Sequence, residues 1–237
     1  MVQRKRDFDP SAIRLISFDC YGTLIDWEQG ILAALRVVLA AHGELPPPHE
    51  LLESYAELEQ AAESPPYRPY RQVLRTVIER LGSRNGFLPD EGELDTLVGS
   101  LPAWRPFEDT VPALRRLSAR YRLAVCSNVD ESLFEATARH LQVTFETVVT
   151  AEAVGAYKPA PAHFRELQRR SGLPPEAILH AAQSLYHDIL PARAQGFATA
   201  WVHRPSVRPR FGATPTAQAL PDLEVESLDA LASRMGA

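Results

Sequence analysis

Short apolar runs alternate with helical patterns along most of this chain, and this alternation constrains the fold more than any other feature. The runs predict buried strands at residues 13–19, 121–128, 145–150, 177–183 and 198–202. Helical patterns between and after them cover residues 111–119, 131–141, 161–171, 188–195 and 228–235, and residues 223–225 are a candidate edge strand. Strands joined through helices run parallel and are covered on both faces. The sequence therefore predicts an α/β fold with a doubly wound, Rossmann-like parallel sheet.

One long segment, residues 27–104, breaks the alternation. It shows only helical periodicity, at residues 28–42, 49–63, 70–81 and 91–101. Prolines interrupt it at residues 46–48 and 65–69, where helices must stop or bend. Because the segment follows the first strand, we expect a helical cap inserted over the carboxyl edge of a core made of residues 1–26 and 105–237. Caps of this kind close over substrates.

The composition narrows the class of partner. Hydrophobic residues make up 45% of the 237 residues and charged residues 23%, which is ordinary globular usage. The net charge of -5 provides no basic surface for nucleic acid, and no apolar run approaches the roughly 20 residues that cross a bilayer. The two cysteines, Cys20 and Cys126, lack the spacing of a metal or disulfide framework. We expect a cytoplasmic protein that acts on a small molecule, with neither nucleic acid nor membrane as partner.

Polar side chains follow the predicted strands where each one ends. Asp19 follows the first, Ser127 and Asn128 the second, Lys158 the third after a loop, and Asp188 the fourth. Ligands of open parallel sheets bind at this edge, so these side chains should converge. An ammonium beside a carboxylate keeps it ionised and stabilises charge that develops during attack. The set suits covalent catalysis by an aspartate.

The same residues resemble the four ordered motifs of the haloacid dehalogenase superfamily. The matching segments are residues 19–24 (DCYGTL), 127–128 (SN), 158–159 (KP) and 184–188 (SLYHD). The resemblance implies that Asp19 is the nucleophile and that Lys158 holds the carboxylates in place. It also implies that Thr23 and Ser127 hydrogen-bond the substrate or the intermediate.

Two positions separate the chain from the magnesium-dependent members of that superfamily. Tyr21 stands where those enzymes carry their second aspartate, and Gln183 stands where they carry a further metal-binding aspartate. Magnesium prefers anionic oxygen ligands. We therefore predict an enzyme without metal or other cofactor, in which Tyr21 lines the substrate pocket or packs at the hinge of the cap.

The sequence DxYGT resembles the type II L-2-haloacid dehalogenases in particular. In that family an aspartate displaces the leaving group from carbon two of a small carboxylic acid, and water hydrolyses the resulting ester. By this resemblance Ser127 and Asn128 bind the substrate carboxylate, while Asp188 orients Lys158 or activates the hydrolytic water. Relatives often pair, so the chain could form a homodimer.

Two leaving groups fit the sequence, a halide and an amine. Typical type II dehalogenases carry an arginine in the early cap that receives the halide, whereas residues 49–60 contain none. Arg68 or Arg71 could replace it from elsewhere in the cap. The missing arginine also fits an offshoot that includes azetidine-2-carboxylate hydrolase, in which an amine is released by ring opening.

Two further readings compete with these. A magnesium phosphatase could tolerate Tyr21 and Gln183, and loss of activity with a chelator would identify it. A non-enzymatic member of the fold could bind a carboxylate or a protein partner, and indifference to Asp19→Asn would identify it.

Overall fold

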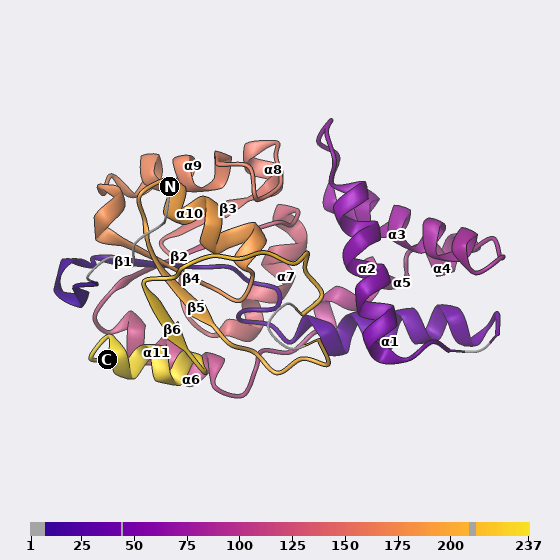
Figure 1. Cartoon of the computed structure of the whole chain (residues 1–237), viewed down its shortest axis with the longest axis horizontal. Coiled ribbons are helices and arrows are strands. Elements are labelled where there is room, and N and C mark those ends of the chain that lie inside the picture. The colour runs from indigo at the N-terminus through magenta and orange to yellow at the C-terminus, as the bar shows by residue number, and fades with distance from the viewer. Residues whose placement is uncertain (1–7, 44, 209–211) are drawn as a thin grey trace.

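The computed structural model describes residues 8–43, 45–208 and 212–237, and its core is a six-stranded parallel sheet (Figure 1). The strand order is β3-β2-β1-β4-β5-β6, with every neighbouring pair parallel. The strands are β1 (Leu15–Phe18), β2 (Arg122–Ser127), β3 (Thr147–Thr150), β4 (Ile178–Ala182), β5 (Ala198–Val202) and β6 (Leu223–Val225). The α/β prediction is confirmed, including the edge strand.

Helices cover both faces of the sheet. Figure 1 shows α8, α9 and α10 over one face, and α6 and α11 over the other. The core helices are α6 (Thr110–Ser118), α7 (Glu131–Leu141), α8 (Ala151–Val154), α9 (Ala162–Ser171), α10 (Leu190–Ala194) and α11 (Leu228–Arg234). The central strand β1 shows why both faces need cover: Leu15 belongs to one apolar cluster, and Ile16 and Phe18 belong to another. Strands that are buried on both faces appear in the sequence as continuous apolar runs.

The helical insert follows β1, as predicted. Its helices are α1 (Trp27–Ala40), α2 (Pro48–Ala62), α3 (Tyr70–Arg84), α4 (Glu91–Leu94) and α5 (Thr96–Ser100), followed by the 3-10 turn η2 (Leu101–Ala103). Figure 1 shows these helices as a separate group beyond one end of the sheet. The helix predicted at residues 91–101 is divided at Asp95, which leaves the helical conformation at φ -88° and ψ 0°. The assignment of residues 27–104 as one domain stays a prediction.

Short elements around the site depart from the predicted pattern. The helix expected at residues 188–195 begins instead as a π-helical turn, η4 (Leu185–Ile189), which places Asp188 in a widened turn. Helix α8 was not predicted because it is only one turn long, from the N-cap Thr150 to Gly155 in the left-handed conformation. The remaining 3-10 turns are η1 (Pro10–Ala12) and η3 (Pro175–Ala177).

A core carboxylate anchors the cap at the start of α3. Asp130, buried at the end of the loop after β2, accepts hydrogen bonds from the backbone N–H groups of Tyr70 at 2.6 Å and Arg71 at 3.1 Å. The first N–H groups of a helix have no partners within it, and an anion there is stabilising. Asp130 therefore fixes the position of α3 over the sheet.

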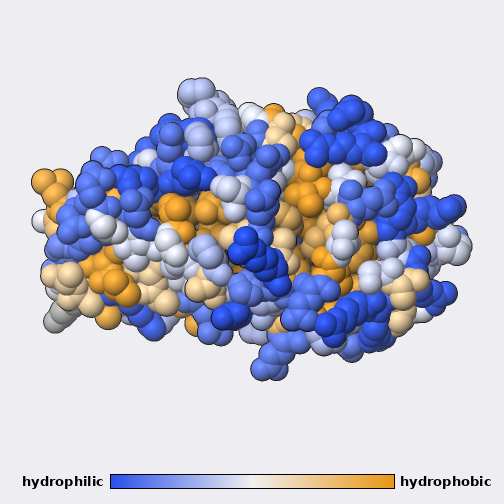
Figure 2. Space-filling model, turned by 180° about the vertical axis from the view of Figure 1, so that it is seen from behind, coloured by the Kyte–Doolittle hydropathy of each residue, from blue (hydrophilic) through white to orange (hydrophobic). Residues whose placement is uncertain are grey.

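The outer surface is mostly polar. Figure 2 shows hydrophilic residues over most of one face, with hydrophobic residues in smaller patches among them. Across the described part of the chain, the helices include none with both the length and the apolar content to cross a membrane.

Candidate active site

Asp19 lies directly after β1 and is held at both of its oxygens. Its Oδ1 accepts a hydrogen bond from Lys158 Nζ at 2.9 Å, and its Oδ2 accepts one from Thr23 Oγ1 at 2.7 Å. Thr23 Oγ1 in turn accepts from the backbone N–H of Gln183 at 3.0 Å. The carboxylate is therefore oriented from two sides, while 8% of the residue remains exposed.

A tight turn after β1 brings Thr23 back to Asp19. The carbonyl of Cys20 accepts from the N–H groups of Leu24 and Ile25 at 2.7 and 3.0 Å. Gly22 has φ +87°, and a Cβ there would lie 2.6 Å from Nε1 of Trp27. Glycine is required on both counts, since side chains strain this φ and the space is filled.

Lys158 joins the carboxylates of Asp19 and Asp188. Its ammonium donates to Asp19 Oδ1 at 2.9 Å, Asp188 Oδ1 at 2.7 Å and the carbonyl of Cys126 at 2.9 Å. These bonds use all three N–H groups of a side chain that is 1% exposed. Burial alone would lower the pKa of Lys158, but the two carboxylates raise it above its ordinary value. The group is a permanent cation at neutral pH.

Asp188 is ionised by its neighbours. Its Oδ1 also accepts from His180 Nε2 at 2.9 Å, and His180 Nδ1 lies 2.8 Å from Ser17 Oγ. Burial favours the neutral acid, but Lys158 and His180 outweigh it, so the pKa of Asp188 is lowered. His180, in the middle of β4, was not predicted as a site residue.

The pKa of Asp19, unlike that of Asp188, is raised. Burial raises it above its ordinary value, while the Lys158 ammonium and the Thr23 hydroxyl oppose that rise. The nearby charge of Asp188 adds to the increase. A carboxylate destabilised in this way is a better nucleophile than one fully stabilised by hydrogen bonds.

Ser127 and Asn128 lie together after β2 but have different surroundings. Asn128 binds the backbone of Lys158, accepting from its N–H at 2.7 Å and donating to its carbonyl at 3.2 Å. Ser127 Oγ is fully buried and has no hydrogen-bond partner among the described residues. A buried hydroxyl without a partner costs free energy, so Ser127 is the group of the two that is available to a ligand.

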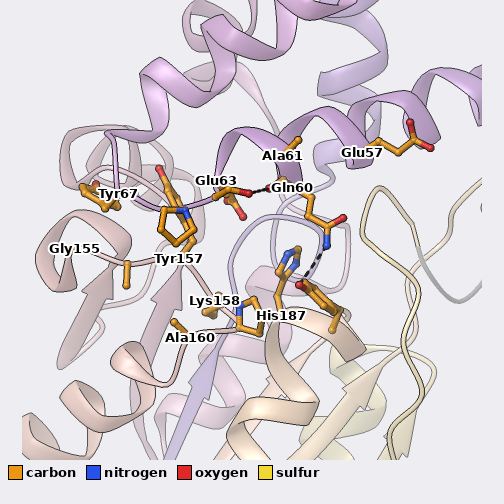
Figure 3. A pocket seen from close by; sticks show the side chains of 15 residues that line it. Glu57, Gln60, Ala61, Glu63, Tyr67, Gly155, Tyr157, Lys158, Ala160 and His187 are labelled. Carbon is orange, nitrogen blue, oxygen red and sulfur yellow. Dashed lines mark hydrogen bonds between the residues drawn. The ribbon is translucent and has the colours of Figure 1, made fainter.

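An inner cavity of about 30 Å³ lies between these residues and the cap. Its lining comprises Asp19, Tyr21, Trp27, Glu59, Glu63, Tyr70, Ser127, Asn128, Lys158, Ser184, His187, Asp188 and Thr214. An outer cavity of about 550 Å³ adjoins it, with Glu63, Lys158 and His187 lining both. Figure 3 shows the outer cavity between Glu63, at the end of cap helix α2, and the core residues Lys158 and His187.

The structure thus brings together Asp19, Thr23, Ser127, Asn128, Lys158 and Asp188. It does not bring the two cap arginines into either cavity lining. Arg71 donates instead to Asp130 and Ser132, at 3.1 and 2.8 Å, with half of its side chain exposed. Tyr21 lines the inner cavity, but its hydroxyl lies 2.7 Å from Thr137 Oγ1 and so is occupied.

Two carboxyl groups of the cap reach the site without having been predicted. Glu59 on α2 is 4% exposed, and its Oε1 accepts from the hydroxyls of Tyr55 at 2.7 Å and Tyr70 at 2.5 Å. Glu63, one turn later, lies 3.4 Å from Asn128 Nδ2. Burial raises the pKa of Glu59 to about 7 and that of Glu63 well above its ordinary value. Their spacing of four residues on one helix face was the only signal in the sequence.

Glu59 should make the free energy of unfolding depend on pH. Its pKa rises from 4.5 to about 7 on folding, so its proton stabilises the folded state below pH 4.5, and that contribution is lost as pH rises to about 7. We expect the free energy of unfolding of the wild type, relative to Glu59→Gln, to fall across this window by up to about 1.4 kcal/mol per pH unit. Urea unfolding at a series of pH values measures the difference. Parallel pH profiles of the two proteins would contradict it.

His187 lies where the two cavities meet. Burial lowers its pKa to about 4, so it is neutral at pH 7. Its backbone N–H donates to Ser184 Oγ at 3.0 Å, which ties it to the turn that carries Asp188. No group of three or more His, Cys, Asp or Glu side chains suited to a metal ion occurs within residues 8–43, 45–208 and 212–237.

Known proteins resemble this chain over most of its length. The family model of the haloacid dehalogenase-like hydrolases matches residues 13–196. (S)-2-haloacid dehalogenase H-109 of Pseudomonas putida is 28% identical over 217 residues, which span 85% of this chain and 91% of the relative. The crystal structure of an L-2-haloacid dehalogenase superposes with a TM-score of 0.78 at 28% identity, covering 94% of this chain and 99% of the other. That of a defluorinating L-2-haloacid dehalogenase has a TM-score of 0.76 at 25% identity, covering 95% and 96%.

Proposed function

Since this chain belongs to the haloacid dehalogenase-like hydrolases, we propose that it cleaves a bond at a carbon atom of a small carboxylic acid, with Asp19 as nucleophile. One observation carries the proposal. The Asp19 carboxylate is oriented by Lys158 and Thr23 and also lines a cavity of about 30 Å³. The relatives are named for 2-halo acids, which are small carboxylic acids.

The reaction proceeds in two displacements. A carboxylate oxygen of Asp19 bonds to carbon two of the substrate, and the bond to the leaving group breaks with its electron pair. Water then attacks Cγ of Asp19, which restores the carboxylate, releases the 2-hydroxy acid and gives one proton to solvent. Lys158 stabilises the negative charge on the ester carbonyl oxygen during this attack, because its ammonium already lies 2.9 Å from Asp19.

The unpartnered hydroxyl of Ser127 receives the substrate carboxylate. Ser127 lines the inner cavity with Asp19, and a hydroxyl can donate to a carboxylate oxygen. Asn128 supports this arrangement indirectly, because it holds the backbone of Lys158 at both polar atoms. Asp188 accepts a second hydrogen bond from the Lys158 ammonium, at 2.7 Å.

The proposed reaction needs no metal ion. Tyr21 and Gln183 occupy the two positions that would supply metal-binding carboxylates. Tyr21 Oη lies against Thr137 Oγ1 at 2.7 Å, and Gln183 is used through its backbone, which donates to Thr23 and accepts from Trp201. These neutral groups do not fit a magnesium ion that requires anionic oxygens.

A product screen tests the function directly. The chain, treated with EDTA, is incubated with 2-chloropropionate, chloroacetate, azetidine-2-carboxylate and a phosphate ester, and 2-hydroxy acid, halide, amine and phosphate are measured. We expect a 2-hydroxy acid product from at least one carboxylic acid without metal. Phosphate release that requires magnesium, with no carboxylic acid converted, would overturn the proposal.

Two expectations accompany this function and stay predictions. The first is a cytoplasmic location, and the second is a homodimer, which sedimentation at micromolar concentration would test.

A further inference from the structure

A serine and a histidine interrupt two central strands of the sheet. Strands β1 and β4 are otherwise apolar, but Ser17 lies in β1 and His180 lies in β4, and the register of the strands pairs these two residues directly. Both are 0% exposed, and Ser17 Oγ lies 2.8 Å from His180 Nδ1. Polar side chains buried in a sheet that is covered on both faces cost free energy unless they are hydrogen-bonded. Packing alone does not explain a polar pair at this place.

The second ring nitrogen of His180 contacts Asp188. Nε2 lies 2.9 Å from Asp188 Oδ1, the oxygen that also accepts from Lys158 Nζ at 2.7 Å. Although burial favours the neutral acid, Lys158 and His180 lower the pKa of Asp188, so its carboxylate is ionised and can only accept hydrogen bonds. Nε2 must therefore carry a hydrogen and donate it. In a neutral ring Nδ1 is then an acceptor, to which the hydroxyl of Ser17 donates.

The imidazole ring of His180 is fixed in the sheet. Its strand, β4, pairs with β1 on one side and with β5 on the other. The ring of Phe164 meets the imidazole edge-on, with 5.1 Å between ring centres and 88° between ring planes. A side chain on a packed central strand holds its position more precisely than one on a loop. His180 therefore presents its Nε2 donor to Asp188 from a rigid support.

The two donors on Oδ1 leave the other oxygen of Asp188 available. Among the residues that the structure describes, none donates to Oδ2, and Asp188 lines the inner cavity together with Asp19. With Lys158 as its only donor, the carboxylate could turn about its Cβ–Cγ bond and offer either oxygen to the ammonium. A second donor that is fixed in the sheet removes this freedom. His180 thus keeps one oxygen on Lys158 and leaves the other for a reactant.

We propose that His180 is a positioning residue for hydrolysis of the Asp19 ester. It holds the Asp188 carboxylate so that one oxygen retains the Lys158 ammonium and the other receives a proton from the attacking water. This inference rests on the proposed function of Asp19 and adds a residue to it.

The hydrolytic step balances with water as the only further reactant. The water oxygen bonds to Cγ of Asp19, and one of its protons moves to Asp188 Oδ2. The ester bond then breaks with its electron pair on the departing oxygen, which takes the other proton of the water and leaves as the 2-hydroxy acid. Asp188 releases its proton to solvent, and both carboxylates are restored.

Two variants of His180 and one control test the proposal with the best substrate of the product screen. His180→Leu removes the donor, whereas His180→Gln keeps an N–H group near the position of Nε2. We expect kcat to fall about 30-fold in His180→Leu, with KM nearly unchanged, and to recover to within about fivefold of wild type in His180→Gln. The control, Leu231→Ala, removes buried apolar volume on α11 and so lowers the Tm, but it should keep kcat within about twofold of wild type.

Accumulation of the Asp19 ester distinguishes positioning from a loss of structure. In His180→Leu the ester should form and then break down slowly, so the intact mass measured during turnover should show most of the protein carrying the added substrate mass. A general loss of structure would slow both displacements and accumulate no ester. The two losses should also be non-additive, so His180→Leu should lower the rate of Asp188→Asn by no more than about twofold.

The imidazole tautomer provides a readout that does not depend on turnover. In nitrogen NMR of protein with labelled histidine, the His180 signals, assigned by their loss in His180→Gln, should show a hydrogen on Nε2. A ring with its only hydrogen on Nδ1 could not donate to Asp188 and would overturn the proposal. Wild-type kcat in His180→Leu, without added ester, would also overturn it and leave the function of Asp19 intact. A wild-type protein that forms neither ester nor 2-hydroxy acid would count against both proposals.

Discussion

Replacing Asp19 with asparagine should lower kcat by about 10⁴-fold or more, since the amide cannot displace a leaving group from carbon. The substitution preserves size, and the Lys158–Asp188 pair remains, so the fold should persist. Steady-state assays on the best substrate of the product screen, together with thermal unfolding, measure the two effects. Binding of that substrate should survive, because Ser127 and the cap residues are unchanged.

The control for this variant is Asp229→Asn. Asp229 is on α11, with 61% of its side chain exposed, and pairs with Arg116 far from the cavity. The kcat of the Asp229→Asn protein should stay within twofold of wild type. Retention of more than about a tenth of wild-type kcat by a folded Asp19→Asn protein would mean that another group attacks the substrate.

Lys158→Met should damage both activity and stability. The ammonium is 1% exposed and bridges Asp19 and Asp188, so its loss leaves two buried carboxylates facing each other. Breaking a buried ion pair on one side costs about 3–5 kcal/mol of the free energy of unfolding. We expect kcat to fall about 10³-fold, because neither the nucleophile nor the ester oxygen is then stabilised. Urea unfolding and steady-state assays measure these losses.

A double variant separates the two losses. Asp188→Asn in the Lys158→Met background removes one unpaired charge, so about 1–2 kcal/mol of stability should return. Activity should not return, since the ammonium beside Asp19 is still missing. If Lys158→Met unfolds at the same urea concentration as wild type, the three-way ion pair does not hold this site together.

The alternation of strand and helix was sufficient to predict the fold. A strand buried on both faces must be apolar throughout, and each crossover must contain a helix, so β1 to β6 and the main helices could be located from local pattern. The short elements could not. Helix α8 is one turn long, and η4 is a π-helical turn of five residues. Elements this short leave no periodic pattern in the sequence.

The core side of the site was predictable for a similar reason. Parallel strands end at one edge, so Asp19, Ser127 and the loop bearing Lys158 had to meet there. The cap side was not predictable, because it depends on how α2 and α3 dock. Glu59 resembles the exposed acids beside it in sequence. It is buried where Tyr55 on the same helix and Tyr70 at the start of α3, which Asp130 anchors, both donate to it. His180 was missed because it lies inside a strand, where a histidine is ordinarily structural.

In the proposed reaction the core provides Asp19 as nucleophile, with the ammonium of Lys158 beside it. The cap lines the other side of the same cavity, where it presents the carboxyl groups of Glu59 and Glu63.

The decisive measurement is a single turnover in heavy-oxygen water with enzyme in excess over substrate. After digestion, the masses of the peptide that contains Asp19 and of the 2-hydroxy acid are measured by mass spectrometry. If Asp19 forms an ester that water cleaves at Cγ, the peptide gains one heavy oxygen and the first product carries the ordinary oxygen of the protein. A first product labelled fully from solvent, with an unlabelled Asp19 peptide, would show that water attacks the substrate directly.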